Sequence, residues 1–282
     1  MMENFNSTLI FTDLDGTLLD HHDYNYRAAI PVLEKLELLK VPVIFNTSKT
    51  RAEIISLREK IGNKHPFIVE NGSGIFIPNH YFQQESNINN TSGFDSICLG
   101  ETRAQLLTWL ETTAIHFSHC YSKFHDLTIE EIVNLTGLSK ESAELANTRE
   151  FSEPLHWIGT EKELEAFTAL AIDHKLNVLV GGRFVHLLGK TNKGLATQTL
   201  ANRYLQYGEK KSPTITSSTS QQTIIACGDG NNDIDMLEAA DIAVIVKSPK
   251  NPAPVVNNEK QYLTNQTGPE GWASTIKEIL TL

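Results

Sequence analysis

Near the N-terminus of this 282-residue chain stands Leu9-Ile10-Phe11-Thr12-Asp13-Leu14-Asp15-Gly16-Thr17. Leu9 to Phe11 predict a short buried strand, and open α/β sheets place their ligands at the carboxyl ends of such strands. Gly16 permits the tight turn that follows. Asp13 and Asp15 point to the same side of an extended chain, so their repulsion calls for a cation between them or a proton on one. The stretch predicts an α/β sheet with an acidic, cation-binding site, although Asp-x-Asp-Gly is also a good turn sequence.

A second acidic loop lies far along the chain. The apolar run at residues 223–226 leads into Gly228-Asp229-Gly230-Asn231-Asn232-Asp233, and apolar residues then recur at helical spacing. Asp229 and Asp233 suit Mg²⁺, which proteins hold with one or two carboxylates together with substrate phosphate. The loop lacks the later bidentate Glu of an EF-hand, and turn chemistry alone is the remaining alternative.

Two further residues could bind an anion. Lys193 stands where a helix is predicted to begin, so its ammonium could reach a phosphate or screen the acidic residues. A lone lysine at such a position is also commonly a solvated surface residue. Thr47 follows the predicted strand at residues 43–45, and its hydroxyl could donate to a phosphoryl oxygen or cap the following helix.

Taken together and in this order, these four pieces resemble the haloacid dehalogenase superfamily of phosphohydrolases. The resemblance implies that Asp13 is the nucleophile and that Asp15 is the general acid and base. It further implies that Thr47 and Lys193 bind the phosphoryl group. The residues that it implies at a Mg²⁺ site are Asp13, Asp15 through its backbone carbonyl, Asp229 and Asp233.

Composition and length are consistent with a cytoplasmic enzyme. A chain of 282 residues exceeds a usual single core, which predicts two domains. The formal net charge of −10 argues against nucleic acid as a partner. No secretory signal and no apolar run of transmembrane length are visible, so no membrane partner is expected. Three scattered cysteines, Cys98, Cys120 and Cys227, argue for a reducing compartment.

The pattern of elements predicts an insertion. We expect a discontinuous Rossmann-like parallel-sheet core at residues 1–84 and 189–282, and a smaller α+β cap domain at residues 85–188. The Asn- and Ser-rich residues 83–93 are predicted to be a linker, and residues 208–222 a surface loop. The predicted helices span residues 28–39, 52–61, 101–115, 129–135 and 139–148. The predicted strands span residues 9–11, 43–45, 67–69, 177–180, 184–188 and 223–226.

Three histidines gather in the inserted segment. His116, His119 and His125 could indicate a metal site. Their spacing includes no Cys or acidic partner in a matching pattern, so ordinary surface or packing histidines are the favoured interpretation.

Four stretches narrow the substrate by resemblance. Residues 46–53, 70–73, 149–154 and 181–184 are similar to the mannosyl-3-phosphoglycerate phosphatase family, which releases mannosylglycerate. The residues that this resemblance implies at the substrate are Ser48, Lys49, Arg51, Glu70, Asn71, Gly72, Arg149, Ser152, Glu153, Gly182 and Arg183.

Physical chemistry gives some of these residues a distinct expected role. Arg183 could clamp a carboxylate bidentately or pair with a structural acid. Lys49 and Arg51 could bind the phosphate end. Sugar hydroxyls could bond to Glu70, Asn71 and Glu153, although Asn71-Gly72 is also a turn former.

Other functions remain open at this point. A broader sugar-phosphate phosphatase, a phosphomutase-like transferase and a non-catalytic sugar-phosphate sensor are the alternatives to a phosphatase of sugar-glycerate phosphates. The sequence Thr47-Ser48-Lys49 stands where many related sugar phosphatases have Thr-Gly-Arg, which favours the mannosyl-phosphoglycerate branch. The expected partner is a small phosphorylated sugar-glycerate, and the expected assembly is a monomer or small homo-oligomer.

Overall fold

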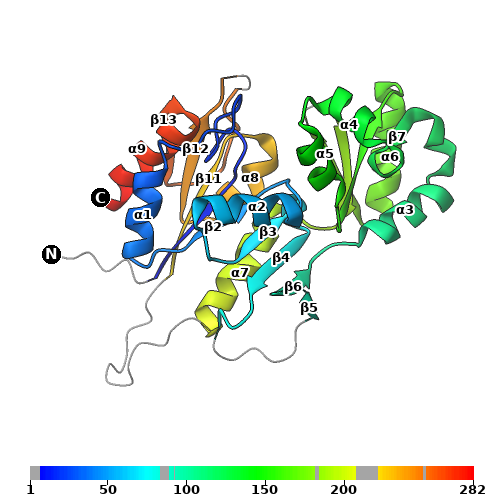
Figure 1. Ribbon diagram of the computed structural model, residues 1–282. Coiled ribbons are helices and arrows are strands. Elements are labelled where there is room, and N and C mark those ends of the chain that lie inside the picture. Colours follow the sequence, from blue (N-terminus) through cyan, green and yellow to red (C-terminus); the bar gives the residue numbers. More distant parts are fainter. Residues whose placement is uncertain (1–6, 83–88, 92, 182–183, 208–221, 250–251) are drawn as a thin grey trace.

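The computed structural model describes residues 7–82, 89–91, 93–181, 184–207, 222–249 and 252–282 (Figure 1). Most of these residues form a large twisted sheet with helices on both faces. The middle of the chain forms a smaller lobe beside it, drawn in green in Figure 1. The fold is therefore an α/β core with an inserted α+β segment, as the sequence predicts.

The large sheet has the strand order β13-β12-β11-β1-β2-β3-β4-β6-β5 within the described residues. All neighbouring strands from β13 to β3 pair in parallel, whereas β4, β6 and β5 pair antiparallel. Its strands are β1 (Thr8–Thr12), β2 (Val43–Asn46), β3 (Phe67–Val69), β4 (Gly74–Pro78), β5 (Asn89–Thr91), β6 (Phe94–Cys98), β11 (Thr223–Gly228), β12 (Ile242–Lys247) and β13 (Gln261–Thr267).

The direction of travel across the sheet reverses between β1 and β11. From β1 the chain proceeds to β2 and β3 on one side, and its later strands β11 to β13 lie on the other. Ligands of open α/β sheets bind in the crevice at the carboxyl ends of the strands that flank such a reversal. The two acidic loops follow these two strands, at Asp13 and Asp229.

Alternating side chains of the central strands enter two separate cores. Ile10 packs against α1 (Ile30–Leu38), α2 (Arg51–Ile61) and α9 (Gly268–Leu280), whereas Leu9 and Phe11 face α7 (Lys193–Tyr207) and α8 (Ile234–Glu238). Because strands buried on both faces need continuous apolar runs, these cores explain the sequences of β1 and β2.

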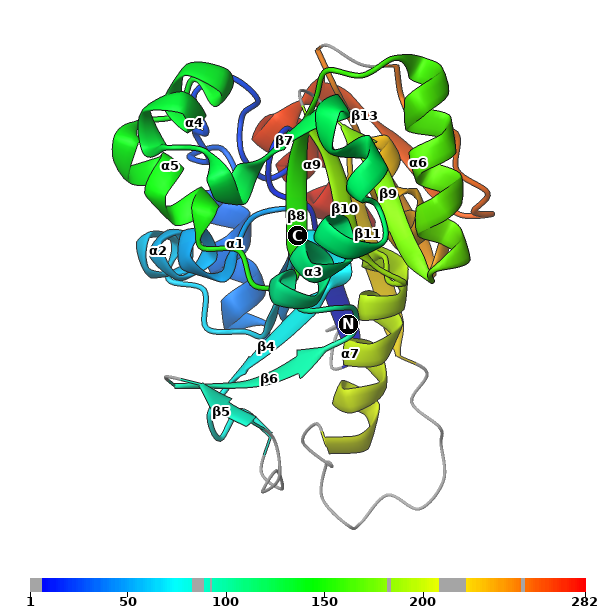
Figure 2. The same cartoon turned by 90° about the vertical axis from the view of Figure 1, so that its right-hand side faces the viewer.

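The inserted lobe has its own antiparallel sheet, in the order β7-β8-β10-β9. One face packs on α3 (Arg103–Thr112) and α6 (Glu161–Asp173), which face the viewer in Figure 2. On the other side, α4 (Ile129–Thr136) and α5 (Lys140–Asn147) form a small core with Phe184 of β10. Its strands are β7 (Tyr121–Lys123), β8 (Ser152–Trp157), β9 (Leu176–Gly181) and β10 (Phe184–Gly189).

Short 3₁₀ elements of three to six residues join the longer helices and strands. They are η1 (Glu70–Gly72), η2 (Ile115–Cys120), η3 (Phe124–Asp126) and η4 (Asn231–Asp233). Capping boxes fix the start of several helices, because a threonine hydroxyl and a Glu or Gln three residues later satisfy backbone N–H groups reciprocally. The capping threonines are Thr50, Thr102, Thr128 and Thr160.

The inserted lobe begins later in the chain than the sequence predicts. Residues 89–91 and 94–98 were expected in a linker and in the cap, but they form β5 and β6 of the large sheet. The two strands have the sequences Asn-Asn-Thr and Phe-Asp-Ser-Ile-Cys, which contain no continuous apolar run, so a search for such runs does not find them. The predicted loop at residues 208–222 lies outside the described residues, except for Gln222. No helix in the described part of the chain is long and apolar enough to cross a membrane.

The chain enters and leaves the inserted lobe at two adjacent points. A Cβ atom added to Gly189 would lie 2.6 Å from the Cα of Gly100 and 2.3 Å from the backbone nitrogen of Glu101. A real Cβ atom does not approach backbone this closely, so the close contact requires glycine at position 189. The two connections therefore touch where they cross from one lobe to the other.

Position 72 requires glycine for two reasons, a backbone conformation with positive φ and a lack of space for a Cβ atom. Its φ is +92°, and an added Cβ would lie 2.1 Å from the backbone oxygen of Asn192. Gly62 also has a positive φ, +78°, but nothing lies within 4 Å of an added Cβ. We expect Gly62→Ala to cost about 1 kcal/mol of stability. Gly72→Ala should cost about 1–3 kcal/mol more, because backbone must move.

Urea denaturation of both variants measures this difference. Equal unfolding midpoints for Gly72→Ala and Gly62→Ala would show that the contact with Asn192 is not tight.

Candidate active site

Three aspartates meet at the carboxyl ends of β1 and β11. Asp13 follows β1, and its backbone N–H donates to the carbonyl of Cys227 on β11 at 2.9 Å. Asp229 follows β11, and Asp233 ends η4. One carboxylate oxygen from each of the three lies within 4.8 Å of the others. The predicted acidic residues are thus brought together across the reversal of the sheet.

A buried lysine holds two of these aspartates. The Lys193 ammonium donates to Asp13 Oδ1 and to Asp233 Oδ1, both at 2.6 Å. Its side chain is fully buried, at the first turn of α7. Asn46, at the end of β2, donates to the Lys193 carbonyl at 3.0 Å. The predicted position of Lys193 beside the acidic residues is therefore observed.

Burial sets the protonation of this cluster. It raises the pKa of the Asp13 carboxyl well above its usual range, although the Lys193 ammonium opposes the shift. Burial and the charge of Asp233 raise the pKa of Asp229 to about 6. Burial alone would lower the pKa of Lys193, but the carboxylates of Asp13 and Asp233 raise it above its usual value. The site thus stabilises positive charge and destabilises further negative charge.

The donor set fits a hard divalent cation. Three buried carboxylates share one ammonium, so their negative charge is not balanced. The Asp233 Oδ2 atom is fixed by the backbone N–H groups of Asp229 and Gly230, each at 3.0 Å. Gly16 leaves room for the carboxylate of Asp229, since an added Cβ would lie 2.6 Å from its Oδ2. Carboxylate oxygens in a shaped site of this kind match Mg²⁺.

Asp15 lies on the exposed side of the acidic cluster. Its Oδ2 lies 2.8 Å from the ammonium of Lys49, and 38% of its side chain is exposed. Lys49 also lies 3.8 Å from Glu53 and 5.0 Å from the ring centroid of Tyr24. Burial opposes the charge of Lys49, but Asp15 and Glu53 raise its pKa above the usual value. Lys49 is therefore a cation beside Asp15.

Three loops converge around Thr47. The Thr47 hydroxyl oxygen accepts from the backbone N–H of Lys49 at 3.2 Å, and its carbonyl accepts from that of Asn71 at 2.9 Å. The Asn71 side-chain oxygen accepts from Asn232 Nδ2 at 3.3 Å. Asn71 therefore links the loop after β3 to the acidic loop after β11. Gly72, its neighbour, packs on the backbone before Lys193.

Glu70 has a different environment from the one expected. It was predicted to bond sugar hydroxyls, but it is fully buried. Its Oε1 accepts from the backbone N–H of Glu150 at 2.8 Å. Its Oε2 accepts from that of Phe151 at 3.1 Å and from the Ser152 hydroxyl at 2.6 Å. Glu70 and Ser152 therefore join the two lobes instead of facing a ligand.

Glu153 and Arg51 also have protein partners. The fully buried Glu153 pairs with Arg103 Nε at 2.5 Å and accepts from the backbone N–H of His125 at 2.8 Å. These contacts replace the expected contact with sugar. Arg51, expected at phosphate, pairs with Glu150 at 2.8 Å. Polar residues with buried partners inside the protein give the same sequence signal as ligand-binding residues. Gly182 and Arg183 lie outside the described residues.

Arg149 crosses from the inserted segment to the loop that carries Thr47. Both terminal nitrogens donate to the Ser48 carbonyl at 3.3 Å, and Nη1 also donates to Ser152 at 2.9 Å. Its buried Nε has no partner among the described residues, and neither does the buried Nδ1 of His186 on β10. Burial, with the charge of Arg149, lowers the pKa of His186 to about 3. His186 is thus a neutral histidine near Arg149.

Sequence reasoning missed three residues of this region. Thr17 donates to Asp229 Oδ1 at 3.2 Å, and Asn46 positions the helix that carries Lys193. Thr17 ends the first acidic stretch and Asn46 precedes Thr47, so their positions in the sequence were a usable signal. His186 interrupts the apolar strand Phe184–Gly189, and a polar residue in such a run is also a signal.

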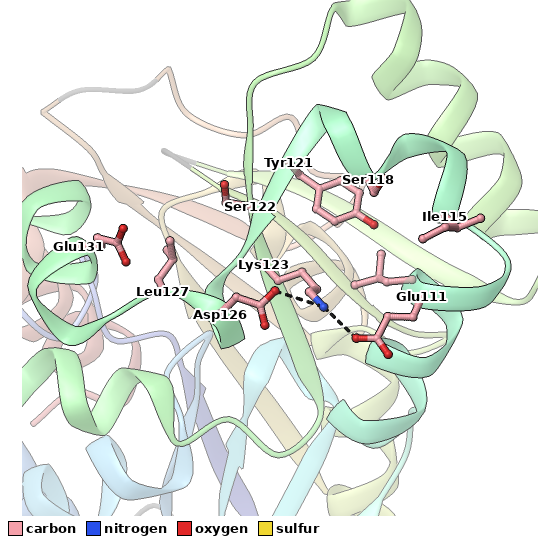
Figure 3. Close-up of a pocket in the computed structure, with 10 residues that line it drawn as sticks. Glu111, Ile115, Ser118, Tyr121, Ser122, Lys123, Asp126, Leu127 and Glu131 are labelled. Atoms are coloured by element: carbon pink, nitrogen blue, oxygen red, sulfur yellow. Dashed lines mark hydrogen bonds and ion pairs between the residues drawn. The ribbon is translucent and has the colours of Figure 1, made fainter.

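A cavity of about 380 Å³ lies along β7 in the inserted lobe (Figure 3). None of the residues that line it belongs to the acidic cluster. Its Lys123 is already paired with Glu111 at 2.8 Å and with Asp126 at 3.2 Å. The cavity includes none of the aspartates of the two acidic loops, so the acidic cluster is the better candidate active site. The residues that line the cavity beside β7 are Leu110, Glu111, Ile115, Ser118, Tyr121, Ser122, Lys123, Asp126, Leu127 and Glu131.

Known proteins resemble the chain in sequence over almost its full length. A family model described as haloacid dehalogenase-like hydrolase matches residues 10–268. A glucosyl-3-phosphoglycerate/mannosyl-3-phosphoglycerate phosphatase of Persephonella marina is 34% identical over 274 residues, 96% of this chain and 97% of that protein. A protein of the same name from Methanococcoides burtonii is 34% identical over 275 residues, 96% and 97% of the two chains.

Solved structures share the fold. A phosphatase of the haloalkanoate superfamily from Bacteroides thetaiotaomicron superimposes with a TM-score of 0.66 at 18% identity, covering 98% of this chain and 96% of its own. The sucrose-phosphatase of Synechocystis superimposes with a TM-score of 0.56 at 18% identity, covering 96% and 97%. Both lobes of the chain are therefore part of the shared architecture.

Removal of the Lys193 ammonium should unbalance the cluster. We expect Lys193→Met to lower the free energy of unfolding of the metal-free protein by about 3–5 kcal/mol, because Asp13 and Asp233 lose their buried partner. Urea denaturation measures the loss. The exposed Lys190 gives a matched control, and Lys190→Met should change stability by less than about 0.5 kcal/mol. Similar losses in the two variants would contradict the buried pairing.

Asp229 should make the metal-free protein less stable as the pH rises. Its folded pKa of about 6 exceeds the unfolded value, so the folded state keeps a proton that the unfolded state releases. Asp229 should therefore contribute a fall of about 3 kcal/mol in the free energy of unfolding as the pH rises from below about pH 4 to above about pH 6.

Denaturation in the presence of a chelator at pH 4 and pH 7 measures this fall. It should be smaller in Asp229→Asn and unchanged in Asp173→Asn, which alters an exposed aspartate of the inserted lobe. Identical pH profiles for wild type and Asp229→Asn would refute the assignment.

Proposed function

The chain belongs to the haloacid dehalogenase-like hydrolase family and is a phosphoric monoester hydrolase, and on this premise we propose its reaction and substrate. The proposed reaction hydrolyses mannosyl-3-phosphoglycerate to mannosylglycerate and phosphate. It depends on Mg²⁺ and passes through an aspartyl-phosphate on Asp13. The observation that carries the proposal is the pairing of Asp13 with the buried Lys193. A second, partly exposed aspartate, Asp15, stands two residues after Asp13.

Asp13 is the proposed nucleophile. One of its oxygens is held by Lys193, which fixes the direction of the carboxylate. Attack of an Asp13 oxygen on phosphorus forms an acyl phosphate and breaks the bond between phosphorus and the glycerate oxygen, which divides one difficult displacement into two steps. Water then attacks the phosphoryl group and restores the carboxylate. Thr47 accepts from Lys49 and can still donate its hydroxyl hydrogen to a phosphoryl oxygen.

Asp15 is the proposed acid and base. The departing glycerate oxygen takes a proton from Asp15, and the attacking water later returns one to it, so protons balance over the cycle. The exposed position of Asp15 leaves it accessible to both groups. Its partner Lys49 holds the carboxylate in place between the two steps.

Asp13, Asp229 and Asp233 would hold the Mg²⁺ ion, with the backbone carbonyl of Asp15 as a further ligand by resemblance to the family. When bound, the ion offsets the repulsion between a carboxylate and an anionic phosphate. Lys193 contributes a second positive charge from the protein itself.

Two observations support a sugar-glycerate substrate. One is the set of side chains between the acidic cluster and the inserted lobe, and the other is the substrate for which two relatives are named. Such a molecule carries a phosphate, a carboxylate and hydroxyls, and therefore needs cations at two points. Lys49, which is paired with Asp15, lies at one point. Arg149 lies beside Ser48 at another, with its Nη1 3.7 Å from Glu70 Oε2. The unpartnered nitrogens of Arg149 and His186 suit an additional oxygen-rich group. Two curated relatives named for glycosyl-3-phosphoglycerates support the same class.

The alternatives share part of this site. A broader sugar-phosphate phosphatase would use the same aspartates, and a phosphomutase-like transferase would deliver the phosphoryl group to a second sugar. A sensor would need neither the nucleophile nor the proton donor, so the intact Asp13 and Asp15 count against it.

Phosphate release from a panel of substrates tests the proposal. With Mg²⁺ present, the purified protein should hydrolyse mannosyl-3-phosphoglycerate with a kcat/KM at least about 100-fold above that for hexose phosphates, a difference of about 3 kcal/mol in transition-state binding. The panel includes glucosyl-3-phosphoglycerate, which differs from the proposed substrate only in its sugar and so measures the preference for mannose. Equal rates across the panel would favour a broad phosphatase, and transfer to a sugar would favour a mutase.

The nucleophile has a matched control. Asp13→Asn should lower kcat by at least about 10⁴-fold while the protein remains folded, because the covalent step is lost. Asp235→Asn alters an exposed aspartate of α8 and should retain activity. A folded Asp13→Asn variant with substantial turnover would exclude the aspartyl-phosphate.

A further inference from the structure

The inserted lobe contains a second group of potential metal ligands. His119 and Cys120 lie at the end of η2, and Glu163 lies in the first turn of α6. One ligand atom from each lies within 4.8 Å of the others. His119 Nε2 is 3.2 Å from Glu163 Oε1 and 3.4 Å from Cys120 Sγ. Cys120 is the sequence neighbour of His119, and the fold supplies the acidic partner, Glu163, from 44 residues away.

The three ligand atoms converge on one point. In a nucleophile–histidine–acid relay, the thiol and the carboxylate face different nitrogens of the imidazole ring. Here the same atom, His119 Nε2, faces both Cys120 and Glu163. This arrangement does not fit a relay, whereas atoms gathered around a common centre fit coordination.

The distances match the edges of a tetrahedron around a cation. Zn²⁺ lies about 2.0–2.3 Å from nitrogen, oxygen and sulfur ligands, which separates neighbouring ligand atoms by about 3.2–3.8 Å. The two distances from His119 fall in this range. The imidazole, thiolate and carboxylate donors also suit Zn²⁺ better than Mg²⁺.

One side of the cluster is held by backbone and the other is open. The carbonyl of Cys120 accepts from the backbone N–H groups of Ile158 and Gly159 at 2.7 and 3.0 Å. An added Cβ on Gly159 would lie 3.0 Å from Cys120 Sγ, so glycine leaves space for the sulfur. In contrast, 69% of the His119 side chain and 35% of the Glu163 side chain are exposed. Water could therefore complete a four-coordinate site.

We propose that His119, Cys120 and Glu163 form a binding site for a thiophilic divalent cation of the Zn²⁺ type, separate from the acidic cluster of the core. Binding forms the bond to sulfur as the Cys120 thiol releases its proton to solvent. The ion joins η2 to the start of α6 and so stabilises the inserted lobe. The proposal does not depend on the identity of the phosphorylated substrate.

Cobalt titration of the full-length protein tests the site. Protein freed of metal by a chelator is first supplied with excess Mg²⁺ for the core and then titrated with Co²⁺, which reports sulfur ligation by thiolate-to-metal absorption in the near ultraviolet. The band should reach its full intensity at one Co²⁺ per chain. Added Zn²⁺ should displace the Co²⁺ ion and so remove the band. The band should be absent in Cys120→Ser. Absence of the band in the wild type would overturn the proposal.

Further variants keep the test independent of folding. Glu163→Gln preserves the capping box with Thr160 but removes the carboxylate, and should weaken Co²⁺ binding at least about tenfold. His119→Ala should do the same, whereas the exposed neighbour His116→Ala should not. Cys98→Ser removes the exposed thiol and should leave the band intact. A band that persists in Cys120→Ser, or that disappears in Cys98→Ser, would show adventitious binding and refute the site.

Discussion

The buried ammonium of Lys193 between Asp13 and Asp233 constrains the rest of the structure. A charge in an apolar interior is very costly unless opposite charges meet it at short distance. The end of β1, the start of α7 and the loop after β11 must therefore meet at one point, although they are far apart in sequence. The remaining negative charge of the cluster then requires a further cation. One electrostatic requirement thus positions three elements and gathers the carboxylates of the proposed Mg²⁺ site.

The residues around this cluster were predictable because each follows an apolar run. Asp13 and Asp229 come directly after strands whose two buried faces leave a continuous hydrophobic signal. Residues between the lobes were not predictable in the same way. Glu70 has its partners about eighty residues later, and no local pattern distinguishes a buried carboxylate with distant N–H donors from one that binds a sugar.

Several elements were missed for physical reasons that differ. The strand β8 begins with Ser152 and Glu153, which are buried because hydrogen bonds from other segments satisfy them, so apolar periodicity is absent. The helix α6 could have been predicted, since Thr160 and Glu163 form a capping box before an apolar pattern. The ligand cluster at His119 required the tertiary structure, because Glu163 lies 44 residues away.

The touching glycines Gly100 and Gly189 make the inserted lobe separable in principle from the core. For the core, residues 101–188 are equivalent to one long loop whose two ends lie together. The entropic cost of closing a loop grows only slowly with its length, so a longer or shorter insertion would change the stability of the core little. Domains are readily inserted or exchanged at such positions. A core of this type can therefore acquire a new lid in evolution, or by grafting, while its strand order and its charged centre stay the same.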